Sequence, residues 1–167
     1  MNKHWYAIYT KPRWEKKVAK LLGDKHIEHY CPLNKVYRKW SDRMKMVEMP
    51  LFSSYVFVRL DLAKEQLAVR QTDGVLNFVY WLGKPAVIKD EEIIVIRKFL
   101  NEYEDVEAIA FDQEIGAGSK IVITSGLMMG ETGEVIDMDN KMAEVVIESI
   151  GFKLKAKIPV GRLEVRK

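Results

Sequence analysis

The stretch Pro50-Leu51-Phe52-Ser53-Ser54-Tyr55-Val56-Phe57-Val58-Arg59-Leu60 decides how the first half of this chain folds. Its second part, Tyr55–Leu60, consists mainly of aromatic and β-branched residues, which predicts a buried strand. The segment His4–Thr10 has the same character and stops at Lys11-Pro12, because proline cannot continue the pairing of a central strand. The first half of the chain therefore contains at least two expected strands.

Helices are expected between and after these strands. From Arg13 to Asp24, apolar residues recur at the spacing of one helical face, and a basic stripe lies on another face. A short helix is expected over Ala63–Gln71, and a turn at Asp73-Gly74 leads into a strand over Val75–Trp81. A last helix is expected from Asp90, which caps its start, to about Asn101.

A β-hairpin with a polar turn at Ser41-Asp42 is expected over Val36–Met49. Its tip carries Trp40 among four cations, Arg38, Lys39, Arg43 and Lys45. Such a tip suits contact with nucleic acid or with a protein, and Trp40 suits a place over the sheet equally well.

The acidic segment Glu102–Glu107 lacks hydrophobic periodicity and indicates a linker. The residue pattern of the chain changes after it. Beyond it, short β-branched runs are separated by glycines and by Asp139-Asn140. The runs are Lys120–Thr124, Glu134–Met138, Ala143–Ile147 and Lys153–Ile158. This pattern predicts a small β-barrel.

The composition is that of a globular protein, with 48% hydrophobic and 31% charged residues in 167. No apolar run is long enough to cross a membrane, and the lone Cys31 agrees with a reducing cytoplasm. Charge is uneven: residues 1–60 hold 13 Lys and Arg against five Asp and Glu, whereas residues 103–167 hold eight against 12. A polyanion is the natural partner of the first part.

Several segments, taken in order, resemble the NusG/Spt5 family of transcription elongation factors. In the first half these are Trp5–Lys11, Pro50–Val58 and Gly74-Val75. In the second half, Gly118–Val135 resembles the glycine-punctuated KOW motif, whose tight loop needs residues that tolerate positive φ. Pro50–Val58 and Lys84–Ile88 are most similar to specialised paralogues of the RfaH/UpxY antiterminator type.

The resemblance implies an α+β protein with two domains. An N-terminal NGN domain, residues 1–102, would contain an antiparallel sheet flanked by helices. An acidic linker at 103–113 would lead to a small SH3-like β-barrel, the KOW domain, at 114–167. The valine and isoleucine runs, with five glycines between Gly116 and Gly133, favour strand over the helical hairpin that RfaH stores.

The resemblance also implies a transcription elongation or antitermination factor that acts on particular operons, of the capsule or polysaccharide type. Such a factor would be a monomer in the cytoplasm. It would not be an enzyme and would need no cofactor. Its NGN domain would bind the clamp helices of the largest RNA polymerase subunit through an apolar pocket. The pocket residues would be Tyr9, Phe52, Tyr55, Trp81, Ile93 and Ile96. Phe52 and Tyr55 are expected to be partly exposed, whereas Ile93 and Ile96 suit the core as well as the pocket.

Two further contacts are implied. Phosphates of the non-template strand or of upstream DNA would meet Lys11, Arg13, Lys17, Lys20, Arg70 and Gln71. The KOW loop would meet a partner such as a small-subunit ribosomal protein through Gly126, Leu127, Met128, Met129 and Gly130. Because NusG usually has Gly-Pro-Phe-x-Gly there, the absence of the aromatic residue argues against binding to termination factor Rho.

Other functions find less support in the sequence. His26, His29 and Cys31 lie close together, but a tetrahedral zinc site needs four ligands, so no metal site is expected. No P-loop, nucleophile elbow or zinc-protease motif is present in the sequence. The alternatives that stay open are a general NusG-like elongation factor and a ribosome-associated or RNA-binding KOW protein.

Overall fold

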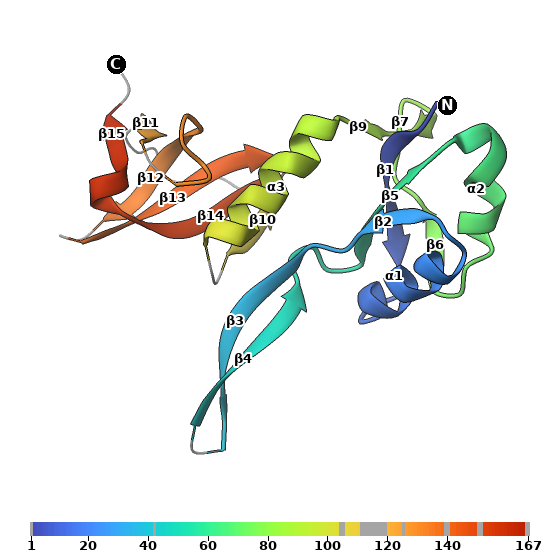
Figure 1. Cartoon of the computed structure of the whole chain (residues 1–167), viewed down its shortest axis with the longest axis horizontal. Helices are drawn as coiled ribbons and strands as arrows, with labels where there is room; N and C mark the ends of the chain where they lie inside the picture. The colour runs from blue at the N-terminus through green and yellow to red at the C-terminus, as the bar shows by residue number, and fades with distance from the viewer. Residues whose placement is uncertain are drawn as a thin grey trace. The chain divides into compact units, whose positions relative to one another are not determined.

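The structure is a computed structural model that describes residues 2–41, 43–103, 106–110, 120–124, 126–138, 141–149 and 152–165 (Figure 1). The chain divides into two compact units. The first contains Met1–Pro32 and Phe52–Ile93, and the second contains Leu33–Leu51 and Ile94–Lys167. Each unit therefore combines segments that are far apart in the sequence.

The first unit is built on an antiparallel sheet. Strand β1 (His4–Thr10) pairs with β5 (Tyr55–Leu60) along its length, from His4 opposite Leu60 to Tyr9 opposite Tyr55. Strand β2 (Glu28–Tyr30) continues the sheet beyond β5. The other edge of β1 pairs with β6 (Val75–Phe78) and β9 (Val87–Ile88). Strands β7 (Tyr80–Trp81) and β8 (Lys84–Pro85) form a separate small hairpin.

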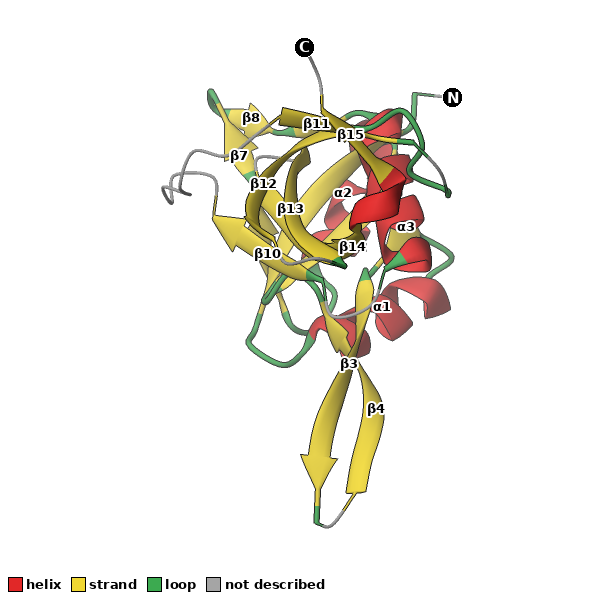
Figure 2. Cartoon of the chain, turned by 90° about the vertical axis from the view of Figure 1, so that its left-hand side faces the viewer, coloured by secondary structure: helices red, strands yellow, loops and turns green. Residues whose placement is uncertain are grey.

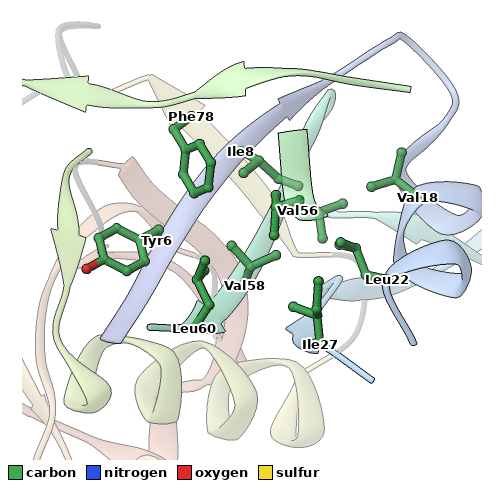
Figure 3. Packing of buried hydrophobic residues seen from close by; sticks show 10 residues of the cluster. Tyr6, Ile8, Val18, Leu22, Ile27, Val56, Val58, Leu60 and Phe78 are labelled. Atoms are coloured by element: carbon green, nitrogen blue, oxygen red, sulfur yellow. The ribbon is translucent and has the colours of Figure 1, made fainter. Parts of the chain in front are cut away.

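The core of the first unit lies between this sheet and helices α1 (Glu15–Asp24) and α2 (Leu62–Arg70). Ile8, Val56 and Leu22 are completely buried and point toward one another (Figure 3). Each such side chain contributes about 1.5–3 kcal/mol to stability through removal from water. Helix α2 begins where the Asp61 side chain accepts a hydrogen bond from the Ala63 N–H at 3.1 Å, a standard N-cap.

Gly74 joins the sheet to α1 through a close backbone approach. Its φ is +89°, and a Cβ at this position would lie 2.6 Å from Cε3 of Trp14 and 2.8 Å from Cγ2 of Val18. Its carbonyl also accepts a hydrogen bond from the Lys11 N–H at 2.9 Å. Only glycine satisfies both the backbone conformation and the contact distance.

The second unit contains a long hairpin and a barrel (Figure 2). Strands β3 (Leu33–Trp40) and β4 (Arg43–Pro50) pair only with each other among the described residues. The barrel is a six-stranded sheet in the order β10-β14-β13-β12-β11-β15. Its strands are β10 (Glu107–Ala110), β11 (Lys120–Ile123), β12 (Thr132–Met138), β13 (Met142–Ser149), β14 (Phe152–Pro159) and β15 (Leu163–Val165), and a 3-10 turn (Val160–Arg162) precedes β15.

Helix α3 (Asp90–Glu102) spans the boundary between the two units. The sequence predicted Asp90 as its cap, but Asp90 is already the first helical residue. Instead, the Glu92 carboxylate reaches back and accepts a hydrogen bond from the Lys89 N–H at 3.2 Å.

The expected α+β class is confirmed, and the barrel consists of strands rather than a helical hairpin. The short strands β2, β8, β9 and β15 were not expected, and two expected segments differ from the structure. The strand expected over Val75–Trp81 is divided into β6 and β7. Within the expected linker, residues 107–110 form β10, which pairs with β14. The boundaries 1–102, 103–113 and 114–167 stay a prediction.

Gly74→Ala should lower the free energy of unfolding by roughly 2–4 kcal/mol, since backbone strain and overpacking each cost about 1–3 kcal/mol. Gly83→Ala is the matched control, because Gly83 also has a positive φ, +79°, but a Cβ at this position would meet nothing within 4 Å. Urea unfolding followed by tryptophan fluorescence measures both variants. Equal losses for the two would show that the contact with Trp14 and Val18 is unimportant.

Candidate functional site

The segment that follows β1 carries a cluster of cations around an aromatic ring. Lys11, Arg13, Lys17 and Lys20, here called the basic patch, are all exposed. The Lys17 ammonium lies 4.1 Å and the Lys11 ammonium 5.1 Å from the centre of the Trp14 ring. These cation–π contacts hold two charges close together without neutralising them. The structure thus brings two of the predicted DNA-binding residues, Lys11 and Lys17, to one ring, and it leaves Arg13 and Lys20 exposed in the same segment.

Glu15 connects the basic patch to the Pro50–Leu60 segment. Its side chain is 6% exposed, and one carboxylate oxygen, Oε1, accepts hydrogen bonds from the N–H groups of Arg13 and Ser54, both at 3.1 Å. Arg13 and Ser54 both have positive φ, 67° and 65°. The charged acceptor therefore stabilises two turns that are unfavourable for residues with a side chain.

Arg70 and Gln71 differ in their surroundings: the Arg70 side chain bonds to other residues, whereas Gln71 is exposed. The Arg70 guanidinium donates a hydrogen bond to Asn77 Oδ1 at 2.8 Å and another to the Tyr80 hydroxyl. It also lies 5.2 Å from the centre of the Phe78 ring. Arg70 therefore ties α2 to β6 and β7, while Gln71 is exposed at the end of α2.

The six predicted pocket residues fall into two groups. Tyr9, Tyr55 and Trp81 reach the surface, with Tyr9 38% and Trp81 70% exposed and Tyr55 half-buried. In contrast, Phe52, Ile93 and Ile96 are at most 2% exposed. The expected partial exposure is confirmed for Tyr55 and wrong for Phe52, whose ring packs edge-on against Phe57 at 5.5 Å. Ile93 and Ile96 belong to the core.

Tyr9 and Tyr55 form one aromatic surface on neighbouring strands. They lie directly opposite each other in the sheet, and their ring centres are 5.0 Å apart. Burial, together with the hydrogen bond to Tyr9, raises the pKa of Tyr55 to about 12. The Tyr55 hydroxyl is therefore neutral, and the two rings offer apolar faces, which suit a protein partner.

Sequence reasoning missed the apolar residues next to Trp81. Leu82 is 86% exposed and has a φ of 52°, and Tyr80 is also exposed. Leu82 and Gly83 form the tight turn between β7 and β8. An exposed leucine in the left-handed region is uncommon and points to a function. The signal was present in the sequence as Leu82-Gly83 between two short β-prone segments.

In the KOW loop of the second unit, two side chains are exposed and a third is buried. Leu127 and Met129 are 52% and 67% exposed, whereas Met128 is fully buried. Met128 therefore cannot offer its side chain to a partner. Gly126 and Gly130 both have positive φ, as the loop requires. The Glu102 carboxylate accepts hydrogen bonds from Arg162 Nη1 at 2.5 Å and from the Leu127 N–H at 3.4 Å.

A cavity of about 880 Å³ also lies in the second unit, between the base of the hairpin and strands β13 and β14. Both signs of charge line it, including Arg38, Glu144 and Lys157. One of its lysines, Lys155, is already paired with Glu107 at 3.0 Å. The cavity shows no preference for a charged ligand.

The histidines and the cysteine give no metal site. Among the described residues, no three His, Cys, Asp or Glu side chains are grouped to hold a metal ion. His29 Nδ1 lies 3.0 Å from the Ile27 carbonyl oxygen, and burial raises the pKa of the Cys31 thiol to about 11. In the described part of the chain, no helix is long and apolar enough to cross a membrane.

Glu15→Ala should destabilise the protein by roughly 1–3 kcal/mol, because two partly buried N–H groups lose their acceptor. Glu15→Gln keeps an oxygen at the Oε1 position and should retain most of the stability. Amide hydrogen exchange at Arg13 and Ser54 measures the effect directly, and exchange should become faster in the alanine variant only. Equal protection in both variants would exclude the proposed role of the carboxylate.

Comparisons with known proteins identify relatives of this chain. The sequence model of the family described as "Transcription termination factor nusG" matches residues 3–97. The protein named "Transcription termination/antitermination protein NusG" from Streptococcus pyogenes serotype M3 is 26% identical over 175 residues, which cover 97% of this chain and 96% of the relative. The protein of the same name from Staphylococcus epidermidis is 27% identical over 179 residues, which cover 97% of this chain and 95% of the relative.

A solved structure has the same fold. The structure titled "Domain interaction in Thermotoga maritima NusG" superposes with a TM-score of 0.68 and 24% identity, covering 100% of this chain and 99% of that one. The family match extends over more than half of the 167 residues. This chain therefore belongs to the NusG family of transcription termination factors.

Proposed function

We propose that this chain is a transcription elongation and antitermination factor that binds the clamp helices of the largest RNA polymerase subunit. The surface for this contact is formed by Tyr9, Tyr55 and Trp81, with Tyr80 and Leu82 beside Trp81. Partly exposed aromatic side chains are the usual anchors of a helix that docks on a protein surface. Phe52 supports the surface from the core through its contact with Phe57.

The main support for the proposal is that the aromatic surface of Tyr9 and Tyr55 lies close to the basic patch. Tyr9 and Lys11 are two residues apart, and Glu15 holds the backbone of Arg13 to that of Ser54, the neighbour of Tyr55. A protein that occupies polymerase next to DNA needs an apolar surface and a phosphate-binding surface side by side. We propose that the basic patch contacts the non-template strand or the upstream DNA.

The phosphate contact requires positive charge but no particular base sequence. Lys11, Arg13, Lys17 and Lys20 meet that requirement. Arg70 is better suited to positioning, since its guanidinium is bound to Asn77 and Tyr80. Gln71 stays a candidate for a direct DNA contact.

The finer proposal is that the factor acts on particular operons, of the capsule or polysaccharide type. It is supported by the Pro50–Val58 segment and by the KOW loop, which has Leu127 and Met129 at its surface in place of an aromatic residue. A general elongation factor fits the same surfaces. Chromatin immunoprecipitation separates the two, since a general factor occupies most transcribed genes and an operon-specific factor only a few.

The KOW loop is the proposed site for a protein partner such as a small-subunit ribosomal protein. The exposed side chains available for it are those of Leu127 and Met129. A ribosome-associated protein without polymerase binding would use this loop alone. Binding to the polymerase fragment described next distinguishes that alternative.

Trp81→Ala should weaken binding of the full chain to a clamp-helix fragment by about 10-fold or more, the effect typical of a central aromatic anchor. Trp81 is 70% exposed, so its removal should leave the fold intact. Leu67→Ala is the control, because Leu67 is 66% exposed on α2 outside the proposed surface. Isothermal titration measures both, and unaltered affinity of the Trp81 variant would overturn this assignment.

Charge reversal at two members of the basic patch, Lys11→Glu with Lys17→Glu, should weaken binding to single-stranded and forked DNA by at least roughly 10-fold at low salt. The dependence of affinity on salt should also decrease, by roughly 0.7–0.9 per lost phosphate contact. Lys64→Glu with Lys98→Glu reverses two exposed cations elsewhere and serves as the control. If both pairs weaken binding equally, the basic patch is no specific site.

A further inference from the structure

The hairpin formed by β3 and β4 has an excess of positive charge at its tip. Near its base, Lys35 lies opposite Glu48, so opposite charges face each other. Toward the tip, Arg38 lies opposite Lys45, and like charges in this arrangement destabilise a strand pair. Residues 38–45 contain four cations and one acid, Asp42, which lies outside the described residues. Binding of a polyanion would relieve this repulsion.

The cations are concentrated on one side of the ribbon. Because side chains alternate along a strand, Arg38, Arg43 and Lys45 share one face, called here the basic face. All three are exposed, and Arg38 also lines the cavity at the base of the hairpin, where its Nη2 donates a hydrogen bond to Met49 Sδ at 3.4 Å. The other face carries Tyr37, Met44 and Met46, which are 50%, 60% and 42% exposed, with Lys39. The side chain of Trp40 lies outside the described ones.

The base of the hairpin is firmly attached within the second unit. The buried Asn34 side chain donates a hydrogen bond to the Val106 carbonyl and accepts one from the Val106 N–H at 2.9 Å. Val36, two residues further along β3, is also buried. Beyond it, the exposed residues lie on a ribbon that pairs with no other described strand.

We infer that the basic face of this hairpin binds the phosphate backbone of B-form duplex DNA, at a site separate from the basic patch on α1. The inference rests on the proposed function only in taking DNA as the polyanion. The four residues of β3 that lie beyond Val36 extend roughly 13 Å, at about 3.3 Å per residue. The major groove of B-form DNA, about 12 Å wide, admits a two-stranded ribbon.

Duplex RNA fits this surface less well. Its A-form major groove is deep and narrow, so a ribbon with arginine and lysine side chains cannot enter it. Among the described side chains, those at the outer end of the basic face, Arg43 and Lys45, are cations, which suit a polyanion better than an apolar protein surface. Duplex DNA is therefore the partner that matches both the shape and the charge of the hairpin.

The test compares two double variants of the full chain, each of which removes two cations from the hairpin. Arg43→Gln with Lys45→Gln changes the basic face, and Lys35→Gln with Lys39→Gln changes the opposite face. Fluorescence anisotropy measures the affinity for a duplex DNA, a duplex RNA of the same sequence and a single-stranded DNA over a range of salt concentrations. Binding to the clamp-helix fragment is measured in parallel.

The basic-face variant should bind duplex DNA about 10-fold more weakly, and the slope of log K against log salt should fall by about two. The opposite-face variant should change duplex affinity by less than about threefold. Duplex RNA should bind the unmodified chain more weakly than duplex DNA. Single-stranded DNA and the clamp-helix fragment should bind both variants as they bind the unmodified chain.

Three results would overturn the inference: equal loss in both double variants, no loss in the basic-face variant, or loss of clamp-helix binding instead of duplex binding. The last would make the hairpin a protein-docking element. Failure of the proposed function would give a different result: the unmodified chain would not bind the clamp-helix fragment. The comparison of the two variants on duplex DNA would still test the inference. Unchanged amide shifts at Asn34 and Val106 show that a variant keeps the hairpin folded.

Discussion

The buried carboxylate of Glu15 is the interaction on which both surfaces of the first unit depend. Its Oε1 atom accepts hydrogen bonds from Arg13 and Ser54, which belong to segments about forty residues apart in the chain. Both residues have left-handed backbone conformations that need such support. Because the basic patch begins on one side of this contact and Tyr55 on the other, the carboxylate sets the spacing between cationic and aromatic side chains.

Packing around Trp14 gives the same region its rigidity. The ring lies against Gly74, where no side chain would fit, and carries the ammonium groups of Lys11 and Lys17 near its centre. Cations attached to a fixed ring lose less conformational entropy on binding phosphate than cations on a mobile surface. A rigid scaffold that presents charge next to apolar rings is what a factor bound to polymerase and DNA together requires.

In the second unit, too, buried residues hold the backbone next to exposed side chains. Asn34 fixes the base of the hairpin to Val106, and the charged tip extends beyond that point. In the barrel, Met128 fills the core while its neighbours Leu127 and Met129 stay exposed. In each case one buried residue holds the backbone, and the side chains beside it are exposed.

Hydrophobic period, proline and glycine act locally, so the sequence alone predicted most of the elements and the class of fold. Strands β1 and β5 were predicted to the residue and four barrel strands nearly so, whereas β10 and β15 were not predicted. The sequence was not sufficient for exposure or pairing. Phe52 and Tyr55 lie three residues apart, yet only the contact with Phe57 decided that Phe52 is buried. Arg70 is predicted to contact DNA, and only the structure shows that its guanidinium also binds Asn77 and Tyr80. Burial and pairing depend on residues from other strands and helices, so only the tertiary structure decides which predicted site residues a partner can reach.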